Sequence, residues 1–175
     1  MTFEVANTDY GPVKGVKPTT CLGRDFYKFS SVPFMKAPLG SLRFHDPVSP
    51  EEWTGSLDVT SATPHFISMN YLKEIDGIVD AGVLSVSTPY LDRKLPVAVY
   101  IPGGGFQKAS DVDASNSPDY LLQKDIVYVV LNYRVGPMGF LSLKDPKLGI
   151  LGNGSKRTLQ TLEVILITLQ FLEHQ

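Results

Sequence analysis

Three adjacent glycines, Gly103, Gly104 and Gly105, form the segment of this sequence best suited to chemistry. They follow residues 95–101, an apolar run with the length and composition of a strand. Because glycine has no Cβ, successive backbone N–H groups can converge there on one point, which suits an anion. A plain turn is an equally open interpretation. A Walker phosphate loop and a dinucleotide loop are excluded, since no Gly-Lys-Ser/Thr follows and the glycine spacing differs.

A second cluster, NYRVGPMGF, begins at Asn132, where another apolar run of strand length ends. Gly136 and Gly139 permit a sharp bend of the backbone. Arg134 leaves a buried strand and therefore needs an acceptor for its guanidinium group. We expect Asn132 and Arg134 to hold a loop by hydrogen bonds rather than to take part directly in chemistry.

The remaining candidate groups are three histidines and one cysteine. His45, His65 and His174 lie at no spacing from a serine, cysteine or carboxylate that indicates a nucleophile pair or a metal site. We expect them to be surface or loop histidines. Cys21, in the turn-like context TTCLG, is expected to be chemically inert. The sequence predicts no metal site and no cofactor.

The first third of the chain is predicted to form short strands and coil. Residues 3–34 contain short runs of Val, Phe, Tyr and Thr that are broken by Gly and Pro, which predicts a small meander or pair of hairpins. Five prolines between positions 33 and 64 exclude a long helix there. That stretch is expected to be ordered surface coil, pinned to a core by its large side chains, Phe34, Leu42, Phe44 and Trp53.

The middle of the chain has the pattern of an α/β sheet. Residues 82–88, 95–101 and 126–131 are apolar runs of strand length, which favours strands buried on both faces. Between the last two, Ser117 as N-cap and Pro118 at the first helical position predict a helix. The resulting order of strand, glycine loop, helix and strand is typical of a βαβ unit.

Composition and charge narrow the class of protein. The chain has 175 residues, of which 43% are hydrophobic and 19% charged, so we expect a globular domain. Its 16 Lys and Arg against 18 Asp and Glu lack the basic excess that nucleic-acid binding requires. No apolar run approaches the roughly 20 residues of a membrane span, and the N-terminus lacks a signal pattern. With a single cysteine, the sequence predicts a reducing, cytoplasmic location.

Three stretches together resemble the carboxylesterase/lipase type B family, which includes cholinesterases and insect α- and juvenile-hormone esterases. They are FSSVPFMKAPLGSLRF at residues 29–44, LPVAVYIPGGGF at 95–106, and NYRVGPMGFL at 132–141. The resemblance covers about residues 3–153, and residues 1–153 are expected to be the N-terminal part of the family's domain. It implies α/β architecture, the N-terminal part of an α/β-hydrolase fold: a small N-terminal β-meander followed by the first strands of the mixed central sheet, an incomplete domain.

The resemblance also implies a function. In this family the glycine triplet supplies the oxyanion hole of a serine esterase that works through an acyl-enzyme, so Gly104 and Gly105 would donate their N–H groups, with Gly103 in support. The partner would be a small-molecule ester. The residues matched to the family's other motifs are expected to be structural: Arg43, Asn132, Tyr133, Arg134, Gly136 and Gly139.

The sequence departs from the family pattern at several positions. Pro102 stands where the family has a histidine before the glycines, which removes a side-chain donor. Val79 stands where a glutamate usually pairs with the arginine matched by Arg43. The early disulfide of secreted members has no cysteines to form it.

The family's nucleophile, in a G-x-S-x-G elbow, and its acid and histidine partners are not found in this sequence. Loss of such a nucleophile costs about 10⁶-fold in kcat, so the chain is expected to be catalytically incompetent alone. The alternative is a non-catalytic binding or adhesion protein on the same scaffold.

Residues 154–175 lie outside the resemblance and are expected to be a non-family tail. Leucines and isoleucines at helical spacing predict an amphipathic helix. The tail can also be interpreted as out-of-frame translation. Suitable codons for residues 163–175, read two nucleotides later, give Gly-Asn-Pro-Asn-Asn-Ile-Ala-Val-Phe-Gly-Ala-Ser, which is similar to the family's approach to the nucleophile.

Overall fold

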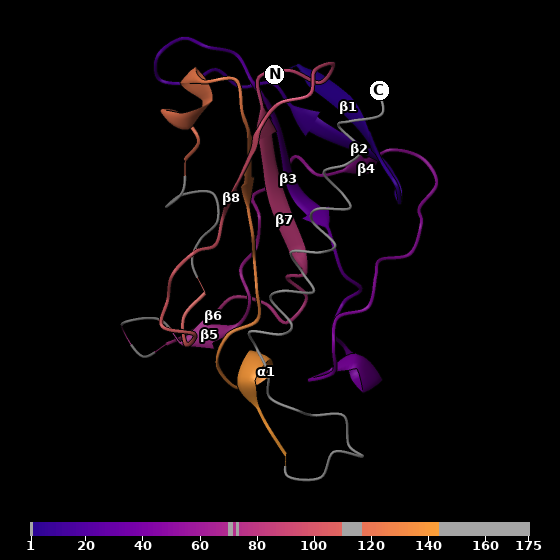
Figure 1. Ribbon diagram of the computed structural model, residues 1–175. Helices are drawn as coiled ribbons and strands as arrows, with labels where there is room; N and C mark the ends of the chain where they lie inside the picture. The colour runs from indigo at the N-terminus through magenta and orange to yellow at the C-terminus, as the bar shows by residue number, and fades with distance from the viewer. Residues whose placement is uncertain (1, 70–71, 73, 110–116, 144–175) are drawn as a thin grey trace.

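The computed structural model describes residues 2–69, 72, 74–109 and 117–143, and a mixed β-sheet dominates it (Figure 1). The spatial order of the main strands is β1-β2-β3-β7-β9-β8. Neighbouring strands are antiparallel except for the parallel pair β8–β9. The bounds are β1 Phe3–Thr8, β2 Gly11–Val16, β3 Tyr27–Pro33, β7 Val83–Thr88, β8 Val97–Tyr100 and β9 Val127–Val130.

The predicted N-terminal meander is present as β1, β2 and β3. The tight turn between β1 and β2 requires Gly11, which has φ +142° and where a Cβ would lie 2.6 Å from Trp53. The Trp53 indole N–H in turn donates to the carbonyl of Pro12 at 2.9 Å. The indole thereby ties the following coil to this hairpin.

The proline-rich stretch is coil, as predicted, with two short regular pieces. These are the 3-10 turn η1 (Gly40–Leu42) and the strand β4 (Leu57–Asp58), which pairs parallel to β2. Phe34 is buried in the main core, and Trp53 packs against its edge. Phe34 and Trp53 therefore hold this segment against the sheet, whereas Leu42 and Phe44, which were expected to do the same, are half-buried and lie outside the core cluster.

The prediction of strands buried on both faces is confirmed for two of the three apolar runs. Every residue of β9 is buried, and most of β7 is buried. The prediction is wrong for residues 95–101, because β8 is the last strand in the sheet order. Val97, Tyr100 and Ile101 are 42%, 41% and 44% exposed.

The helix predicted to begin at Ser117 is also wrong, since the structure has only the 3-10 turn η2 (Leu121–Gln123) in the described residues there. The Ser117 hydroxyl bonds to the Asp119 carboxylate, which accepts the backbone N–H of Cys21 at 2.9 Å. These polar groups thus bind a distant turn instead of starting an α-helix. The parallel pairing of β8 with β9 agrees with the predicted βαβ-like order.

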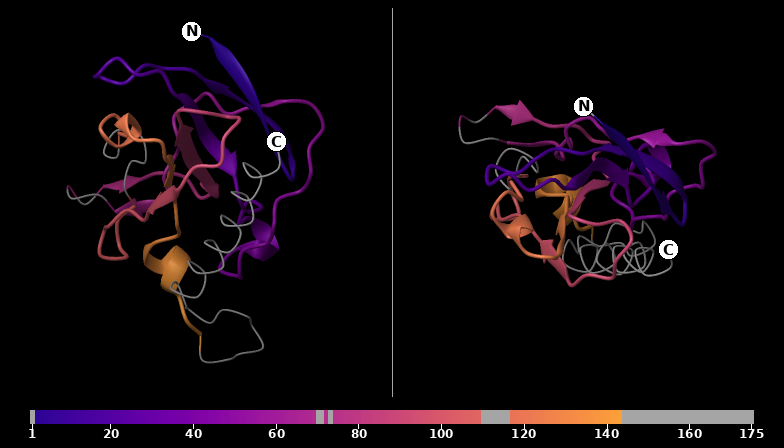
Figure 2. Two further views of the ribbon diagram at one scale, coloured as in Figure 1. Left: turned by 45° about the horizontal axis from the view of Figure 1, so that its top comes forward. Right: turned by 90° about the horizontal axis from the view of Figure 1, so that it is seen from above.

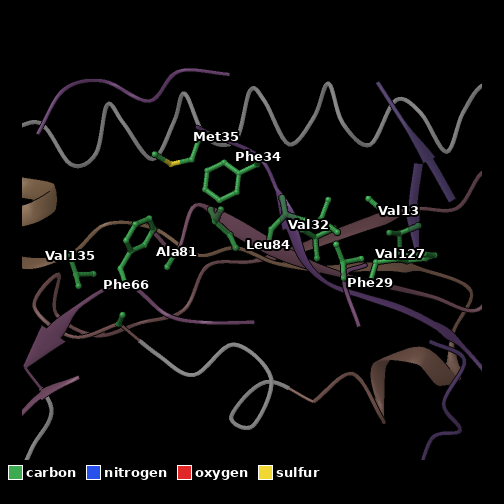
Figure 3. Packing of buried hydrophobic residues seen from close by; sticks show 14 residues of the cluster. Val13, Phe29, Val32, Phe34, Met35, Phe66, Ala81, Leu84, Val127 and Val135 are labelled. Atoms are coloured by element: carbon green, nitrogen blue, oxygen red, sulfur yellow. The ribbon is translucent and has the colours of Figure 1, made fainter. Parts of the chain in front are cut away.

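Buried side chains from the strands and from the coil segments make up the core. Figure 2 shows these strands and connecting segments from two further sides. At one end of the cluster Phe66 lies beside Ala81 and Val135, and Val13 and Val127 lie at the other end (Figure 3). Two further small strands, β5 (Ser68–Met69) and β6 (Ile75–Asp76), form a hairpin. The short helix α1 (Gly136–Phe140) lies at the opposite end of the molecule from β1 and β2 (Figure 1).

Candidate active site

The glycine run forms a tight turn just beyond β8. The carbonyl of Gly104 accepts the N–H groups of Gln107 and Lys108 at 3.1 and 3.0 Å. A Cβ on Gly104 would lie 1.9 Å from the Lys108 carbonyl oxygen, so only glycine fits this position without moving the backbone. The turn therefore depends on the missing side chain of Gly104.

Gly105 faces open space beside this turn. It has φ +59°, and a Cβ built there would meet nothing within 4 Å. Phe106 follows with φ 60° and is 61% exposed. Within the described part of the chain, no carbonyl accepts a hydrogen bond from the N–H of Gly104 or Gly105. Two adjacent backbone donors are therefore available in the turn.

The NYRVGPMGF segment holds the glycine loop at both ends. The Tyr133 hydroxyl donates to the carbonyl of Pro102 at 2.7 Å, ahead of the glycines. The N–H of Gly136 donates to the carbonyl of Phe106 at 2.6 Å, after them. The rings of Phe106 and Phe140 lie 5.2 Å apart. These contacts fix the path of the loop relative to β9 and α1.

Asn132 and Arg134 bind backbone carbonyls of distant loops. The Asn132 side-chain amide, 3% exposed, donates to the carbonyls of Pro64 and Ala81 at 2.8 and 2.7 Å. Arg134, also buried, donates to the carbonyl of His45 at 2.9 Å. Both side chains therefore connect the end of β9 to segments that precede β7.

The two glycines of this cluster allow the chain to turn into α1. Gly136 has φ +55° at the first residue of the helix. A Cβ on Gly139 would lie 2.2 Å from the Arg134 carbonyl oxygen, so the helix approaches the preceding segment too closely for any side chain. Gly136 and Phe140 contact Phe106 of the glycine loop at this bend.

Arg43 is exposed, and its guanidinium lies 5.8 Å from the centre of the Phe44 ring. It makes no ion pair with any residue that the structure describes. Val79, at the position where the family resemblance implies a glutamate, is half-buried. The lack of an ion pair at Arg43 among the described residues agrees with the presence of Val79 in place of the family's glutamate.

The fold places one histidine next to a carboxylate that sequence spacing did not reveal. His65 Nε2 lies 3.4 Å from Asp76 Oδ2, because the pairing of β5 with β6 brings the two segments together. His45 contributes its backbone carbonyl to Arg134, and His174 lies outside the described residues. Cys21 is exposed. Across the described ranges, no group of three or more His, Cys, Asp or Glu side chains could hold a metal ion.

Burial raises the pKa of the Tyr133 hydroxyl above its usual value of about 10. The neutral, hydrogen-bonding form is therefore favoured in the folded state. Stability from this group is present in full below pH ~10 and is lost as pH rises through the higher folded-state pKa.

We predict that Tyr133→Phe lowers the free energy of unfolding by about 0.5–1.5 kcal/mol at pH 8, the value of one hydrogen bond. Above pH ~10 the difference from the parent chain shrinks, because the parent then loses the contribution of the neutral phenol. Urea unfolding of the parent chain and the variant at a series of pH values measures the stability difference and its decrease at high pH. A difference that stays constant to the highest pH would contradict the role given to this hydroxyl.

The solved structures that resemble the chain define its fold class as the α/β-hydrolase fold. The crystal structure of juvenile hormone esterase from Manduca sexta, with OTFP covalently attached, matches 98% of the chain with a TM-score of 0.85 and 30% sequence identity. A structure of PNB esterase matches 97% of the chain with a TM-score of 0.82. The chain covers 34% and 35% of these two chains.

The sequence comparisons then give the family. The model of the carboxylesterase family matches residues 3–153, and the chain belongs to that family. Esterase B1 of Culex pipiens is 39% identical over 149 residues, which are 83% of this chain and 28% of that protein. Juvenile hormone esterase of Tribolium castaneum is 36% identical over 143 residues, 79% of this chain and 24% of that protein. The chain thus spans about a quarter of each of these relatives.

Among the helices that the structure describes, none has the length and apolar character to cross a membrane.

Proposed function

We propose that this chain carries the oxyanion-binding part of a carboxylic ester hydrolase. The N–H groups of Gly104 and Gly105 would donate to the carbonyl oxygen of a small-molecule ester as it becomes negatively charged, and Gly103 would support the turn. The observation that carries this proposal is that both donors lack an intramolecular acceptor among the described residues, on a loop next to open space.

Rigidity of the loop is central to the proposed mechanism. Oxyanion-hole donors are effective because they already point at the developing charge and need no reorganisation during the reaction. Here the Tyr133 hydroxyl and the Gly136 N–H anchor the carbonyls on either side of the glycines. These anchors would keep the two donors directed at one point while the carbonyl carbon becomes tetrahedral.

Pro102 restricts the hole to backbone donors. Its carbonyl is occupied by the Tyr133 hydroxyl, and its buried ring offers no hydrogen-bond donor. One oxyanion-hole donor is worth about 10²- to 10³-fold in kcat. Within this chain, the proposed stabilisation would therefore come from the glycine amides.

The attacking serine, its histidine base and the orienting acid would belong to the portion of the family that this chain does not span. Without them the oxyanion site would bind an ester, but no nucleophile would be present to attack its carbonyl carbon. We propose on this basis that the chain alone is catalytically incompetent.

We predict that the isolated chain is not labelled by a fluorophosphonate probe and hydrolyses p-nitrophenyl acetate at the background rate. Mass spectrometry of the intact protein and absorbance at 405 nm measure the two quantities, with Culex pipiens esterase B1 as the positive control. Covalent labelling at any serine would overturn the proposed division between oxyanion site and nucleophile.

We also propose that the protein works in a reducing, cytoplasmic environment. Cys21 is exposed and free, and a free surface thiol persists best where disulfides are kept reduced. The near balance of charge, formally −2, is unsuited to a nucleic-acid partner. Immunofluorescence with a cytosolic marker tests the location.

A further inference from the structure

The C-terminal end of the glycine loop is bound by a side chain from a distant part of the sequence. The N–H of Ala109 donates to the hydroxyl oxygen of Ser68 at 3.1 Å. Ser68 lies on β5, 41 residues earlier in the chain. Among the described residues no other acceptor is bonded to this N–H, and Ala109 is 6% exposed. Because the N–H of a buried residue needs a partner, the hydroxyl fixes where the loop ends.

This bond follows directly on the two bonds that close the glycine turn. The carbonyl of Gly104 accepts the N–H groups of Gln107 and Lys108, and Ala109 is the next residue. Bonds inside a turn set its shape, whereas a bond to another segment sets its position in the fold. The Ser68 hydroxyl is such an outside partner, so it helps to fix where the Gly104 segment lies.

Ser68 belongs to a different part of the fold from the other two anchors of the loop. Those anchors, the Tyr133 hydroxyl and the Gly136 N–H, come from one short segment that follows β9. Ser68 comes from the β5–β6 hairpin, which lies toward the same end of the molecule as α1 (Figure 1). The glycine loop is thus held by two separate segments of the chain.

The hairpin that carries Ser68 is itself closed by several contacts. The N–H of Ile67 donates to the carbonyl of Ile78 at 2.9 Å, and the N–H of Ile78 donates to the carbonyl of His65 at 3.0 Å. Ser68 is the register partner of Asp76, whose Oδ2 lies 3.4 Å from His65 Nε2. The strand next to Ser68 is therefore held by both backbone bonds and a side-chain pair.

Asn132 connects this hairpin to the other two anchors. Its buried amide donates to the carbonyls of Pro64 and Ala81, which flank the hairpin on either side. Asn132 also directly precedes Tyr133, one of the anchors of the glycine loop. Residues 64–81 and the segment after β9 are therefore bound to each other as well as to the loop.

We propose that Ser68 is a positioning residue for the oxyanion amides. Its hydroxyl does not touch the ester; it holds Ala109, so that the N–H groups of Gly104 and Gly105 stay directed at one point. The inference rests on the proposed function of the glycine loop. A serine or threonine hydroxyl can accept this bond, whereas an alanine leaves the N–H without its acceptor and allows the turn to shift.

Hydrogen exchange of the full chain, followed by NMR, tests whether Ser68 holds the loop. Ser68→Ala should speed exchange of the amides of residues 107–109 by about tenfold, because local opening of the turn becomes easier, and Ser68→Thr should restore the parent rates. The matched control is Thr8→Val at the end of β1, where the hydroxyl likewise accepts a backbone N–H, that of Tyr10 at 3.3 Å. Unchanged rates in Ser68→Ala, or an equal increase in Thr8→Val, would overturn the proposal.

Kinetics separate this role from a general effect on stability. In a hybrid in which residues 3–153 replace the matching segment of Culex pipiens esterase B1, Ser68→Ala should lower kcat about tenfold with little change in KM for p-nitrophenyl acetate, since misaligned donors act on the transition state. Ser68→Thr should restore kcat, and Thr8→Val should leave it unchanged.

A Gly104→Ala variant of the hybrid distinguishes the two ways in which this account could be wrong. If Gly104→Ala lowers kcat and Ser68→Ala does not, the positioning role of Ser68 is wrong and the oxyanion site stands. If neither substitution lowers kcat, the proposed function and the role of Ser68 are both wrong.

Discussion

Replacing Gly104 by alanine is expected to lower kcat by about 10²- to 10³-fold in a hybrid esterase, in which residues 3–153 of this chain replace the matching segment of Culex pipiens esterase B1. The hybrid would supply the nucleophile that we propose to be missing from the isolated chain. The new Cβ would lie 1.9 Å from the Lys108 carbonyl oxygen, so the turn must move and its N–H groups lose their alignment. Steady-state hydrolysis of p-nitrophenyl acetate measures the effect.

A second glycine provides the control for this experiment. Gly40 has φ +54° and open space around its Cβ position, so Gly40→Ala introduces backbone strain outside the proposed hole. Gly105→Ala, at φ +59° and with the same open surroundings, introduces comparable strain inside it. Gly40→Ala should keep kcat near that of the parent hybrid, and Gly105→Ala should lower it. If Gly104→Ala and Gly105→Ala match Gly40→Ala, the glycine loop is not the oxyanion site.

Asn132→Ala is expected to lower the free energy of unfolding by about 2–4 kcal/mol. The substitution removes both hydrogen bonds of the buried amide and leaves the carbonyls of Pro64 and Ala81 without these donors. An unsatisfied buried carbonyl costs about 1–3 kcal/mol; here the bond to Ala81 is buried and the bond to Pro64 is partly buried. Urea denaturation followed by circular dichroism gives the value.

Asn7→Ala is the matched control, because Asn7 lies on β1 with its side chain exposed. A surface substitution of this kind changes stability by no more than about 0.5 kcal/mol. Equal effects of the two substitutions would show that Asn132 does not connect β9 to the loops before β7. The difference between the two changes in free energy of unfolding therefore gives the contribution of the two Asn132 hydrogen bonds, separate from the general effect of replacing an asparagine.

The strands could be predicted from the sequence because their signal is local. The run at 126–131 is apolar throughout, and β9 is buried on both faces. The run at 95–101 has the same pattern but forms an edge, and no local pattern states how many neighbours a strand has. The helix expected at Ser117 failed for a related reason: Asp119 binds the N–H of Cys21, 98 positions earlier in the sequence.

The candidate site likewise combines a feature that the sequence shows with contacts that only the folded chain creates. The glycine run could be singled out from the sequence, because three residues without Cβ directly after a strand suit either a plain turn or a site for an anion. The anchoring of that loop could not be derived, because the Tyr133 hydroxyl meets Pro102 only when β8 and β9 pair in parallel. The contact of His65 with Asp76 likewise exists only in the folded chain.

A crystal structure of the hybrid esterase with a trifluoromethyl ketone bound covalently to its serine tests the central claim most directly. Such an adduct carries a tetrahedral carbon with a negatively charged oxygen. We predict that this oxygen lies about 2.7–3.1 Å from the backbone nitrogens of both Gly104 and Gly105. An adduct whose oxygen bonds to other donors, with these two N–H groups turned toward protein carbonyls, would contradict it.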